Sequence, residues 1–104
     1  LVGFTGRFDE GAAYDESPHA REVARHLGMT LHERTITADD FIDHIGTVIY
    51  HLDSPAAGPG AFSQFMVSQM ASQHRKVVLG GQGGDEIFGG YTRYLVAYFE
   101  QCIK

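Results

Sequence analysis

The 104-residue chain has few basic residues, a single cysteine and no long apolar run. Eight Lys and Arg residues stand against thirteen Asp and Glu residues, a formal net charge of −5 that argues against binding to a nucleic-acid backbone. No apolar stretch approaches the roughly 20 residues that span a bilayer, so we expect no membrane contact. Cys102 has no partner for an internal disulfide, which is typical of a reducing compartment, and we expect a cytoplasmic protein.

Size and termini indicate a piece of a larger domain. The hydrophobic content of 43% and charged content of 20% are ordinary for a globular fold. The first residue is Leu1 rather than an initiator methionine, and Lys104 ends a segment that still has a helical pattern. Six histidines are present without an H-E-x-x-H pattern or a second cysteine, so we expect no zinc site. We therefore predict an excised fragment without zinc.

The first third of the chain predicts a strand, a helix and a strand. Residues 1–8 are apolar and β-prone, and a polar loop follows them. Ser17 and Pro18 are suited to the N-cap and first position of a helix whose apolar residues recur at helical spacing until Gly28 ends it. Residues 31–36 predict a second strand, near a sheet edge because it carries charged side chains.

The remainder predicts further alternation of helices and strands. Thr37 and Asp40 form a capping-box-like start to a helix with an apolar stripe from 41 to 52. A loop is expected over residues 53–60, a helix from about Phe62, an interior parallel strand over 76–79, and a last helix capped by Thr92. Alternating strands and helices indicate an α/β fold with a parallel sheet and flanking helices, whose ligands bind at the carboxyl ends of strands.

Residues 79–91 join an apolar run to a glycine-rich turn and two adjacent carboxylates. Glycines at 80, 81, 83 and 84 let backbone N–H groups converge on an anion, and Asp85 and Glu86 offer the hard oxygen atoms that Mg²⁺ prefers. A Walker loop is excluded because Asp85 follows the glycines, and a Rossmann fingerprint is excluded because Glu86 stands where a small residue is needed. The alternative is a strand-to-helix turn that binds nothing.

The string G-G-Q-G-G-D-E-I-F-G-G-Y at 80–91 resembles the signature of the synthetase domain of glutamine-dependent asparagine synthetases, a branch of the ATP-pyrophosphatase superfamily. Residues 48–59 are similar to that family's substrate loop, which commonly reads close to Y-H-x-D-E-P-x-A-D-P. Residues 4–8 match the position of the family's second core strand. The resemblance covers nearly the whole chain, and the glycine-acid motif is its most specific part.

The resemblance implies an adenine nucleotide α-hydrolase-like fold, a Rossmann-like three-layer arrangement, of which residues 1–104 are a fragment. The family's first core strand and its S-G-G-x-D-S phosphate loop would lie before Leu1, and a family lysine would lie beyond Lys104. We therefore expect the isolated fragment to be inactive. Because the missing strand would lie between residues 1–8 and 76–80, we expect either direct pairing of those two strands or a homo-oligomer formed through their unpaired edges.

The resemblance also implies a reaction and roles for particular residues. ATP adenylates aspartate to β-aspartyl-AMP, and ammonia from a glutaminase domain then gives asparagine, AMP and diphosphate. By the family's pattern Asp85 is a Mg²⁺ ligand, Gly80 and Gly81 contact the AMP portion through backbone atoms, and Gly6 matches a position whose backbone meets adenine.

Gln82 and Glu86 are the catalytic candidates. Well-known glutamine-hydrolysing members carry Glu where this chain has Gln82, and an amide donates and accepts hydrogen bonds but cannot act as a carboxylate base. The acyl acceptor and the nitrogen source therefore stay open, and Gln82 is alternatively a tolerated loop residue. Glu86 is a second metal ligand, a substrate-orienting base, or simply an acid favoured at a helix start. The rival functions are another carboxylate-adenylating amide synthetase, of β-lactam-forming or secondary-metabolite type, and a nucleotide-binding or assembly module without catalysis.

Overall fold

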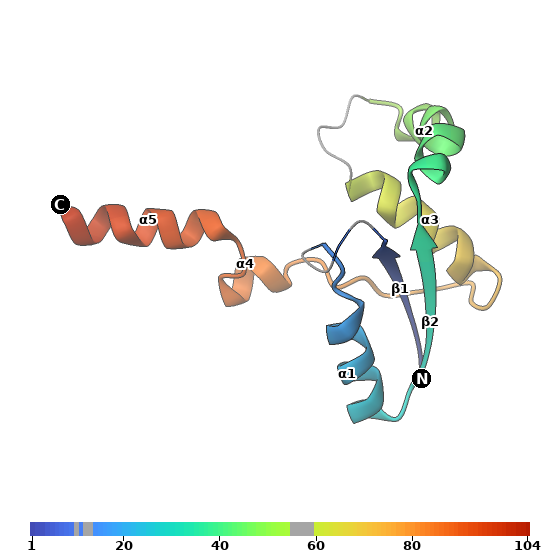
Figure 1. The fold of residues 1–104 in the computed structure, drawn as a ribbon, viewed down its shortest axis with the longest axis horizontal. Coiled ribbons are helices and arrows are strands. Elements are labelled where there is room, and N and C mark those ends of the chain that lie inside the picture. The colour runs from blue at the N-terminus through green and yellow to red at the C-terminus, as the bar shows by residue number, and fades with distance from the viewer. Residues whose placement is uncertain (10, 12–13, 55–59) are drawn as a thin grey trace.

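A computed structural model describes residues 1–9, 11, 14–54 and 60–104 of the chain. Strands and helices alternate in its first half, and helices alone follow in its second half (Figure 1). In chain order the elements are β1 (Val2–Phe8), α1 (Ser17–Leu27), β2 (Thr30–Ile36), α2 (Ala38–Leu52), α3 (Gly60–Ser72), α4 (Gly84–Phe88) and α5 (Thr92–Ile103).

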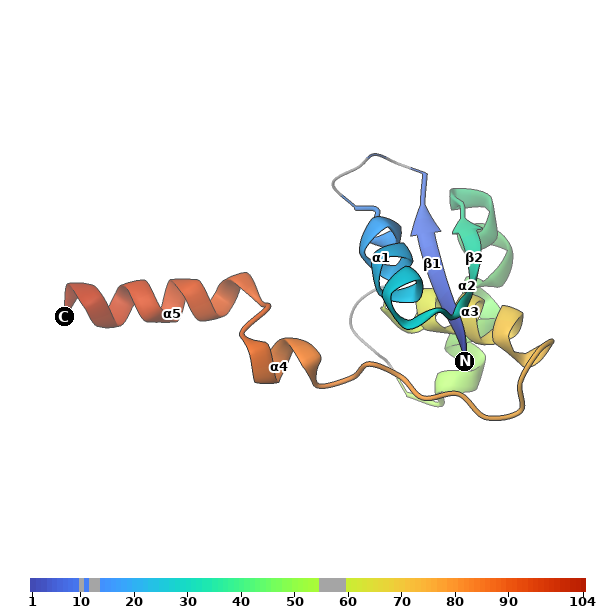
Figure 2. The ribbon, with the colours of Figure 1, turned by 90° about the horizontal axis from the view of Figure 1, so that it is seen from below.

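The two strands form a parallel sheet with helices packed against it. β1 pairs with β2 in a register that runs from Val2 opposite Thr30 to Phe8 opposite Ile36, and α1 connects the two strands. Both α1 and α3 pack against both strands, and α2 packs against α3 (Figures 1 and 2). The prediction of an α/β fold with a parallel sheet and flanking helices is confirmed at this level.

A small hydrophobic core lies between the sheet, α2 and α3. Ile36 from β2, Val48 from α2, and Phe62 and Met66 from α3 form one buried cluster, with Ala61 and Phe65 packed against it. The Phe41 ring meets the Phe62 ring edge-on at a centroid distance of 5.0 Å. The expected apolar stripes of α2 and α3 therefore face each other, which fixes α3 against the sheet.

Local signals mark most helix ends as expected. Gly28 adopts the left-handed conformation, with φ of 60°, and ends α1. Thr37 and Asp40 form a complete capping box at the start of α2, with the Asp40 N–H donating to Thr37 Oγ1 at 3.2 Å. The assignment of Ser17 as N-cap was wrong by one residue. Its N–H donates to Asp15 Oδ1 at 3.0 Å, so the helix already includes Ser17.

Two further boundaries differ from the sequence predictions. Tyr91 is the N-cap residue of α5 and Thr92 is its first helical residue, so the predicted cap at Thr92 is wrong. Gly60 begins α3 rather than ending the preceding loop. Asp53 ends α2 with a left-handed φ of 54°, and the rest of the predicted loop, residues 55–59, lies outside the described residues.

The predicted interior strand over residues 76–79 is wrong. In the described chain this run forms no ladder with any strand, and the side chains of Val77 and Leu79 are 80% and 97% exposed. A strand needs a neighbour to satisfy its N–H and C=O groups, and a cleft separates this run from β1. Direct pairing of residues 1–8 with 76–80 is therefore absent, whereas association between chains stays a prediction.

Residues 76–104 are called the C-terminal arm below. Residues 78–82 line the same pocket as β1 and α3, and the helices α4 and α5 then extend away from the sheet and its helices (Figure 2). The radius of gyration is 16.3 Å, compared with about 13 Å for a compact domain of this size. No residue of α4 or α5 is buried. The arm therefore holds its helices without support from the hydrophobic core. No helix among the described residues is long and apolar enough to cross a membrane.

Candidate functional site

A cleft of about 490 Å³ is lined by residues of β1, of α3 and of the start of the C-terminal arm. We call it the β1 cleft. Its lining includes four residues singled out from the sequence, namely Gly6, Gly80, Gly81 and Gln82. The structure therefore brings the separate glycine sites of the sequence to one place.

Packing alone accounts for glycine at position 6. A Cβ built on Gly6 would lie 2.8 Å from Cδ1 of Ile36 and 3.2 Å from Cγ2 of Val67. Distances this short would require the side chains of Ile36, from β2, and Val67, from α3, to shift before a larger residue could fit at position 6. Gly6 is thus a structural glycine that also lines the β1 cleft, and a contact with adenine stays a prediction.

Packing among the described residues does not require the glycines at 80, 81, 83 and 84. A Cβ on Gly81 or Gly84 would meet no atom within 4 Å, and within this group only Gly83 has a positive φ, 94°, that favours glycine. Among the described residues, no backbone carbonyl accepts a hydrogen bond from the N–H groups of residues 80–83. The Gly84 N–H donates weakly to Gly81 O at 3.4 Å. Such open amides suit an anionic ligand.

Asp85 and Glu86 do not line the β1 cleft. A Cβ built on Gly90 would meet the Asp85 carboxylate, so a larger residue there would require that side chain to move. The Gly90 N–H donates to the Asp85 carbonyl at 3.0 Å, which closes the turn after α4. The Asp85 carboxylate therefore lies close to the backbone at Gly90.

Glu86 is engaged by Tyr91. The Tyr91 hydroxyl donates to Glu86 Oε1 at 3.0 Å, and the Arg93 guanidinium lies 4.1 Å from the centroid of the Tyr91 ring. The hydrogen bond to Glu86 raises the pKa of the Tyr91 phenol above its usual value, with burial and the nearby carboxylates adding to the shift. Tyr91 thus stays protonated, as a donor, across the neutral range.

The fit to Mg²⁺ rests on the donor chemistry. In the part of the chain that the structure describes, no three His, Cys, Asp or Glu side chains converge as a metal site. Mg²⁺ is commonly held by one or two carboxylates together with phosphate oxygens, so a single Asp85 beside open amides suits one corner of such a site. The remaining ligands would come from the nucleotide and from outside these residues.

Comparison with known proteins identifies the family. The family model described as asparagine synthase matches residues 1–104, the whole chain. The chain belongs to the asparagine synthase family. The resemblance drawn from the glycine-acid motif is thereby confirmed.

Several curated asparagine synthase family members are similar over most of this chain. A putative glutamine-hydrolysing asparagine synthetase of Mycobacterium tuberculosis (strain H37Rv) is 37% identical over 94 residues, which are 90% of this chain and 14% of that protein. Asparagine synthetase 1 of Bacillus subtilis (strain 168) is 33% identical, over 89% of this chain and 14% of its own length. Asparagine synthetase 1 of Saccharomyces cerevisiae is 38% identical, over 80% and 14% respectively. No solved structure matches.

The sequence analysis did not predict that α3 contributes residues to the β1 cleft. Ser63, Gln64 and Ser68 line the β1 cleft opposite the glycines. The small residues Ser63, Val67 and Ala71 recur every four positions, which is a signal for a helix face that approaches another element closely.

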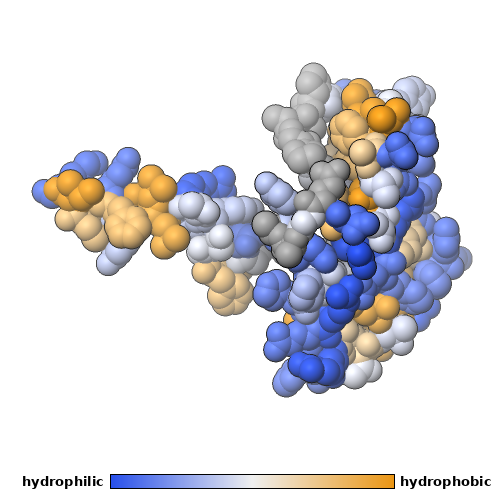
Figure 3. All heavy atoms as spheres, in the orientation of Figure 1, coloured by the Kyte–Doolittle hydropathy of each residue, from blue (hydrophilic) through white to orange (hydrophobic). Residues whose placement is uncertain are grey.

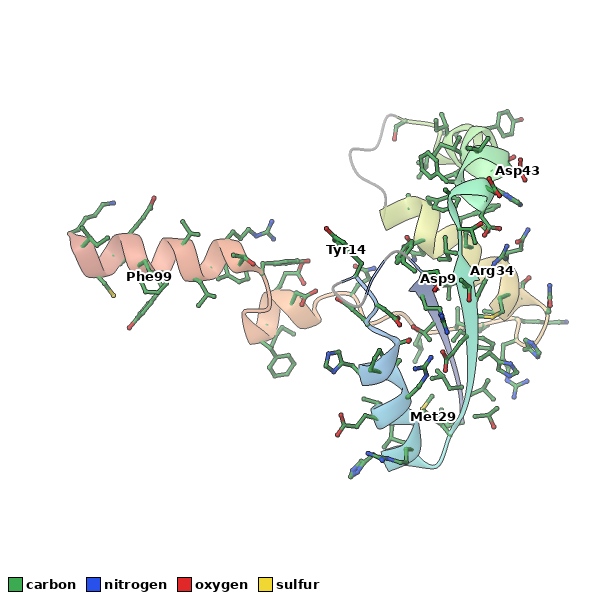
Figure 4. The ribbon with its side chains drawn as sticks, viewed as in Figure 1. Asp9, Tyr14, Met29, Arg34, Asp43 and Phe99 are labelled. Carbon is green, nitrogen blue, oxygen red and sulfur yellow. The ribbon has the colours of Figure 1, made fainter. Side chains whose placement is uncertain are left out.

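Arg34 is a second residue that the motifs did not reveal. It lies on β2 beside α3 (Figure 4), and its Nη1 donates to Gln69 Oε1 at 2.6 Å. Its Nη2 donates to Asp40 Oδ1 at 3.3 Å, so one guanidinium joins β2, α3 and the capping box of α2. Arg34 fixes the helix that carries Ser63 and Gln64 against the sheet, which makes its contribution to the cleft indirect.

Proposed function

We propose that the chain is part of a glutamine-dependent asparagine synthetase. In this reaction the aspartate side-chain carboxylate attacks the α-phosphate of ATP, diphosphate leaves, and ammonia from a glutaminase domain displaces AMP from β-aspartyl-AMP. Family membership and the names of the curated relatives support this proposal. The chain spans about 14% of the length of the relatives quoted above, so the complete activity belongs to a longer protein.

The open amides at the β1 cleft carry the proposal. N–H groups of Gly80, Gly81 and Gln82 are without backbone partners among the described residues, and they line the same cleft as Gly6. Adenylation releases diphosphate with several negative charges, so donors that are already oriented lower the barrier. We assign the Gly80 and Gly81 backbone to the AMP portion and the Gly6 backbone to adenine.

Asp85 would hold Mg²⁺ through its carboxylate, and the bound ion would supply charge neutralisation at the phosphate chain. The hydrogen-bonding amide of Gln82 lines the cleft and would bind the acyl intermediate. Glu86 would orient the substrate or add a metal ligand. These assignments place anion binding, intermediate binding and metal binding within seven consecutive positions, 80–86.

The same cleft supports the proposal that the chain is an incomplete adenine nucleotide α-hydrolase-like domain. β1 has one unpaired edge, the β-prone run at 76–79 has two, and the β1 cleft lies between them. A single additional strand would satisfy both facing edges and bury Val78 and Leu79. We accordingly propose that residues 1–104 are a fragment of the synthetase domain of a cytoplasmic enzyme, and that the isolated fragment is inactive.

Gln82 favours one rival function. Because an amide stands at the cleft wall, a carboxylate-adenylating amide synthetase with another acyl substrate is the second candidate. Measuring carboxylate-dependent exchange of diphosphate into ATP with the complete protein separates the two. Aspartate as the preferred carboxylate supports asparagine synthesis, and preference for another carboxylate supports the rival. Exchange with none of them would indicate a nucleotide-binding module and contradict both.

A substitution at Gly81 tests the role of the open amides. Gly81→Ala adds a methyl group into open space, so we expect unchanged thermal stability. We expect the Kd for ATP in the complete protein to rise about tenfold, because the methyl group keeps a ligand from the backbone. Gly46→Ala in α2 also enters open space, far from the cleft, and is the matched control. Equal ATP affinity in the two variants would contradict the proposed cradle.

A further inference from the structure

The turn between α4 and α5 brings Tyr91 back to one acid of the motif. Gly89, with a left-handed φ of 70°, ends α4, and two residues later the Tyr91 side chain meets the Glu86 carboxylate. Gly90 leaves space for the Asp85 carboxylate, and the Tyr91 hydroxyl reaches Glu86 Oε1 at 3.0 Å. This pairing gives a physical reason for the sequence Gly-Gly-Tyr after the acidic residues.

Tyr91 is itself held in place. The Arg93 guanidinium lies 4.1 Å from the Tyr91 ring centroid, and the Tyr94 ring lies at a centroid distance of 5.7 Å. A cation over an aromatic face and a neighbouring ring both restrict the rotamers of the tyrosine. The hydroxyl is therefore presented to Glu86 from a side chain fixed on two sides.

Only one oxygen of Glu86 is engaged by the described residues. Oε1 accepts from Tyr91, and no hydrogen bond to Oε2 is formed in the described chain. A glutamate side chain on a surface otherwise has three rotatable bonds and would lose that freedom when it binds a ligand. A hydrogen bond formed in advance lowers this entropic cost.

We propose that Tyr91 is a positioning residue, which holds Glu86 so that its second carboxylate oxygen is free for the magnesium-bound nucleotide or the acyl substrate. This inference rests on the proposed function of the complete protein. Tyr91 acts through Glu86 and itself touches no substrate. The structure gives Tyr91 a specific polar contact, the hydrogen bond to Glu86 Oε1.

Tyr91→Phe in the complete protein tests this inference, because it removes the hydroxyl and keeps the ring beneath Arg93. We expect kcat/KM for aspartate-dependent exchange of diphosphate into ATP to fall about tenfold at unchanged thermal stability. Tyr94→Phe is the matched control, since Tyr94 also lies beside Arg93, with its ring centroid 5.5 Å from the guanidinium. An unchanged kcat/KM in Tyr91→Phe, or an equal loss in Tyr94→Phe, would overturn the inference.

A double-mutant cycle separates positioning from a direct role. If Tyr91 acts through Glu86, the double variant Tyr91→Phe with Glu86→Gln loses no more activity than Glu86→Gln alone. A further tenfold loss in the double variant would overturn the inference. The cycle therefore distinguishes an effect carried by the carboxylate from an independent effect of the hydroxyl.

NMR decides the contact without any enzyme assay. Because the Tyr91 hydroxyl donates to Glu86 Oε1 at 3.0 Å, Glu86→Gln in the complete protein should shift the ring signals of Tyr91, which are assigned by their loss in Tyr91→Phe. Unchanged Tyr91 signals would overturn the inference. Absence of exchange with any carboxylate, together with shifted Tyr91 signals, would overturn the proposed function while the Tyr91 contact stands.

Discussion

Residues 1–75 and the C-terminal arm, residues 76–104, differ in how many of their side chains are buried. The first region buries Ile36, Val48, Phe62 and Met66 in one cluster, whereas no residue of the arm is buried. In Figure 3 apolar side chains of α5 lie open on the surface of the arm. Both regions contain helices, but among the described residues only the first region buries an apolar face of its helices in a core.

Strands behave differently from helices in this comparison. The helix α5 satisfies its backbone groups internally and forms in the arm without burial. The run at 76–79 has a sequence suited to a strand, but its hydrogen bonds must come from another segment, and β1 lies across a cleft. A strand prediction therefore depends on the presence of a partner, whereas a helix prediction depends mainly on local residues.

The candidate site joins these two regions. Gly6 is fixed by packing in the first region, whereas Gly80 and Gly81 belong to the arm. The side of the cleft formed by Gly80 and Gly81 is therefore stabilised by little packing, whereas the side formed by Gly6 is stabilised by the packed first region. Ligand binding at the β1 cleft would consequently depend on what holds the arm in the complete protein.

The largest difference between the regions is expected for deletion of an apolar side chain. Met66 is fully buried, so Met66→Ala in the 104-residue chain should lower the free energy of unfolding by about 2–5 kcal/mol. Leu95→Ala in α5, where the side chain is 58% exposed, should change it by less than about 0.5 kcal/mol. Urea denaturation followed by circular dichroism measures both. Similar losses in the two variants would show that the arm packs as tightly as the first region.

A smaller difference between the two regions is expected when the threonines near the starts of α2 and α5 are replaced by alanine. Thr37 Oγ1 accepts the Asp40 N–H at 3.2 Å, so Thr37→Ala should lower the free energy of unfolding by about 1 kcal/mol. Thr92 is the first residue of α5 and makes no capping contact, so Thr92→Ala should be neutral. The same denaturation measurement applies. A loss at Thr92 that equals the loss at Thr37 would restore the cap predicted from the sequence.

These residues show what could be predicted from the sequence. The capping box at Thr37 and Asp40 and the end of α1 at Gly28 depend on neighbours a few positions away, and the structure confirms them. The exact starts of α1 and α5 were missed because each depends on which of two adjacent residues takes the cap geometry. The strand predicted at 76–79 is wrong because a strand needs a hydrogen-bonding neighbour, and this run has none among the described residues.

For the candidate site, the glycines and acids at 80–86 predict an anion and metal site, and this stays a prediction. The structure adds that Gly80, Gly81 and Gln82 line one cleft with Gly6, whereas Asp85 and Glu86 do not line it. The contacts that Gly6 makes room for come from Ile36 and Val67, which are remote in sequence, so only the fold reveals them.

The smallest and most selective difference is expected in the response to pH. Hydrogen bonds from the Thr37 N–H and hydroxyl, together with Arg34, hold the pKa of Asp40 below its usual value. Its stabilising contribution is therefore complete above the unfolded-state value of about 3.9 and is lost as pH falls through the folded-state pKa. Asp40→Asn should therefore make the free energy of unfolding of residues 1–75 fall less steeply as the pH is lowered. Urea denaturation at each pH measures this.

The arm should respond at the opposite end of the pH scale. The pKa of Tyr91 is raised by its hydrogen bond to Glu86, so its contact is complete below the unfolded-state value of about 10 and is lost as pH rises through the folded-state pKa. NMR ring signals of Tyr91 should shift there, while the methyl signal of Met66 stays constant because the arm shares no core with it. A concerted change at both residues would mean that the two regions unfold as one unit.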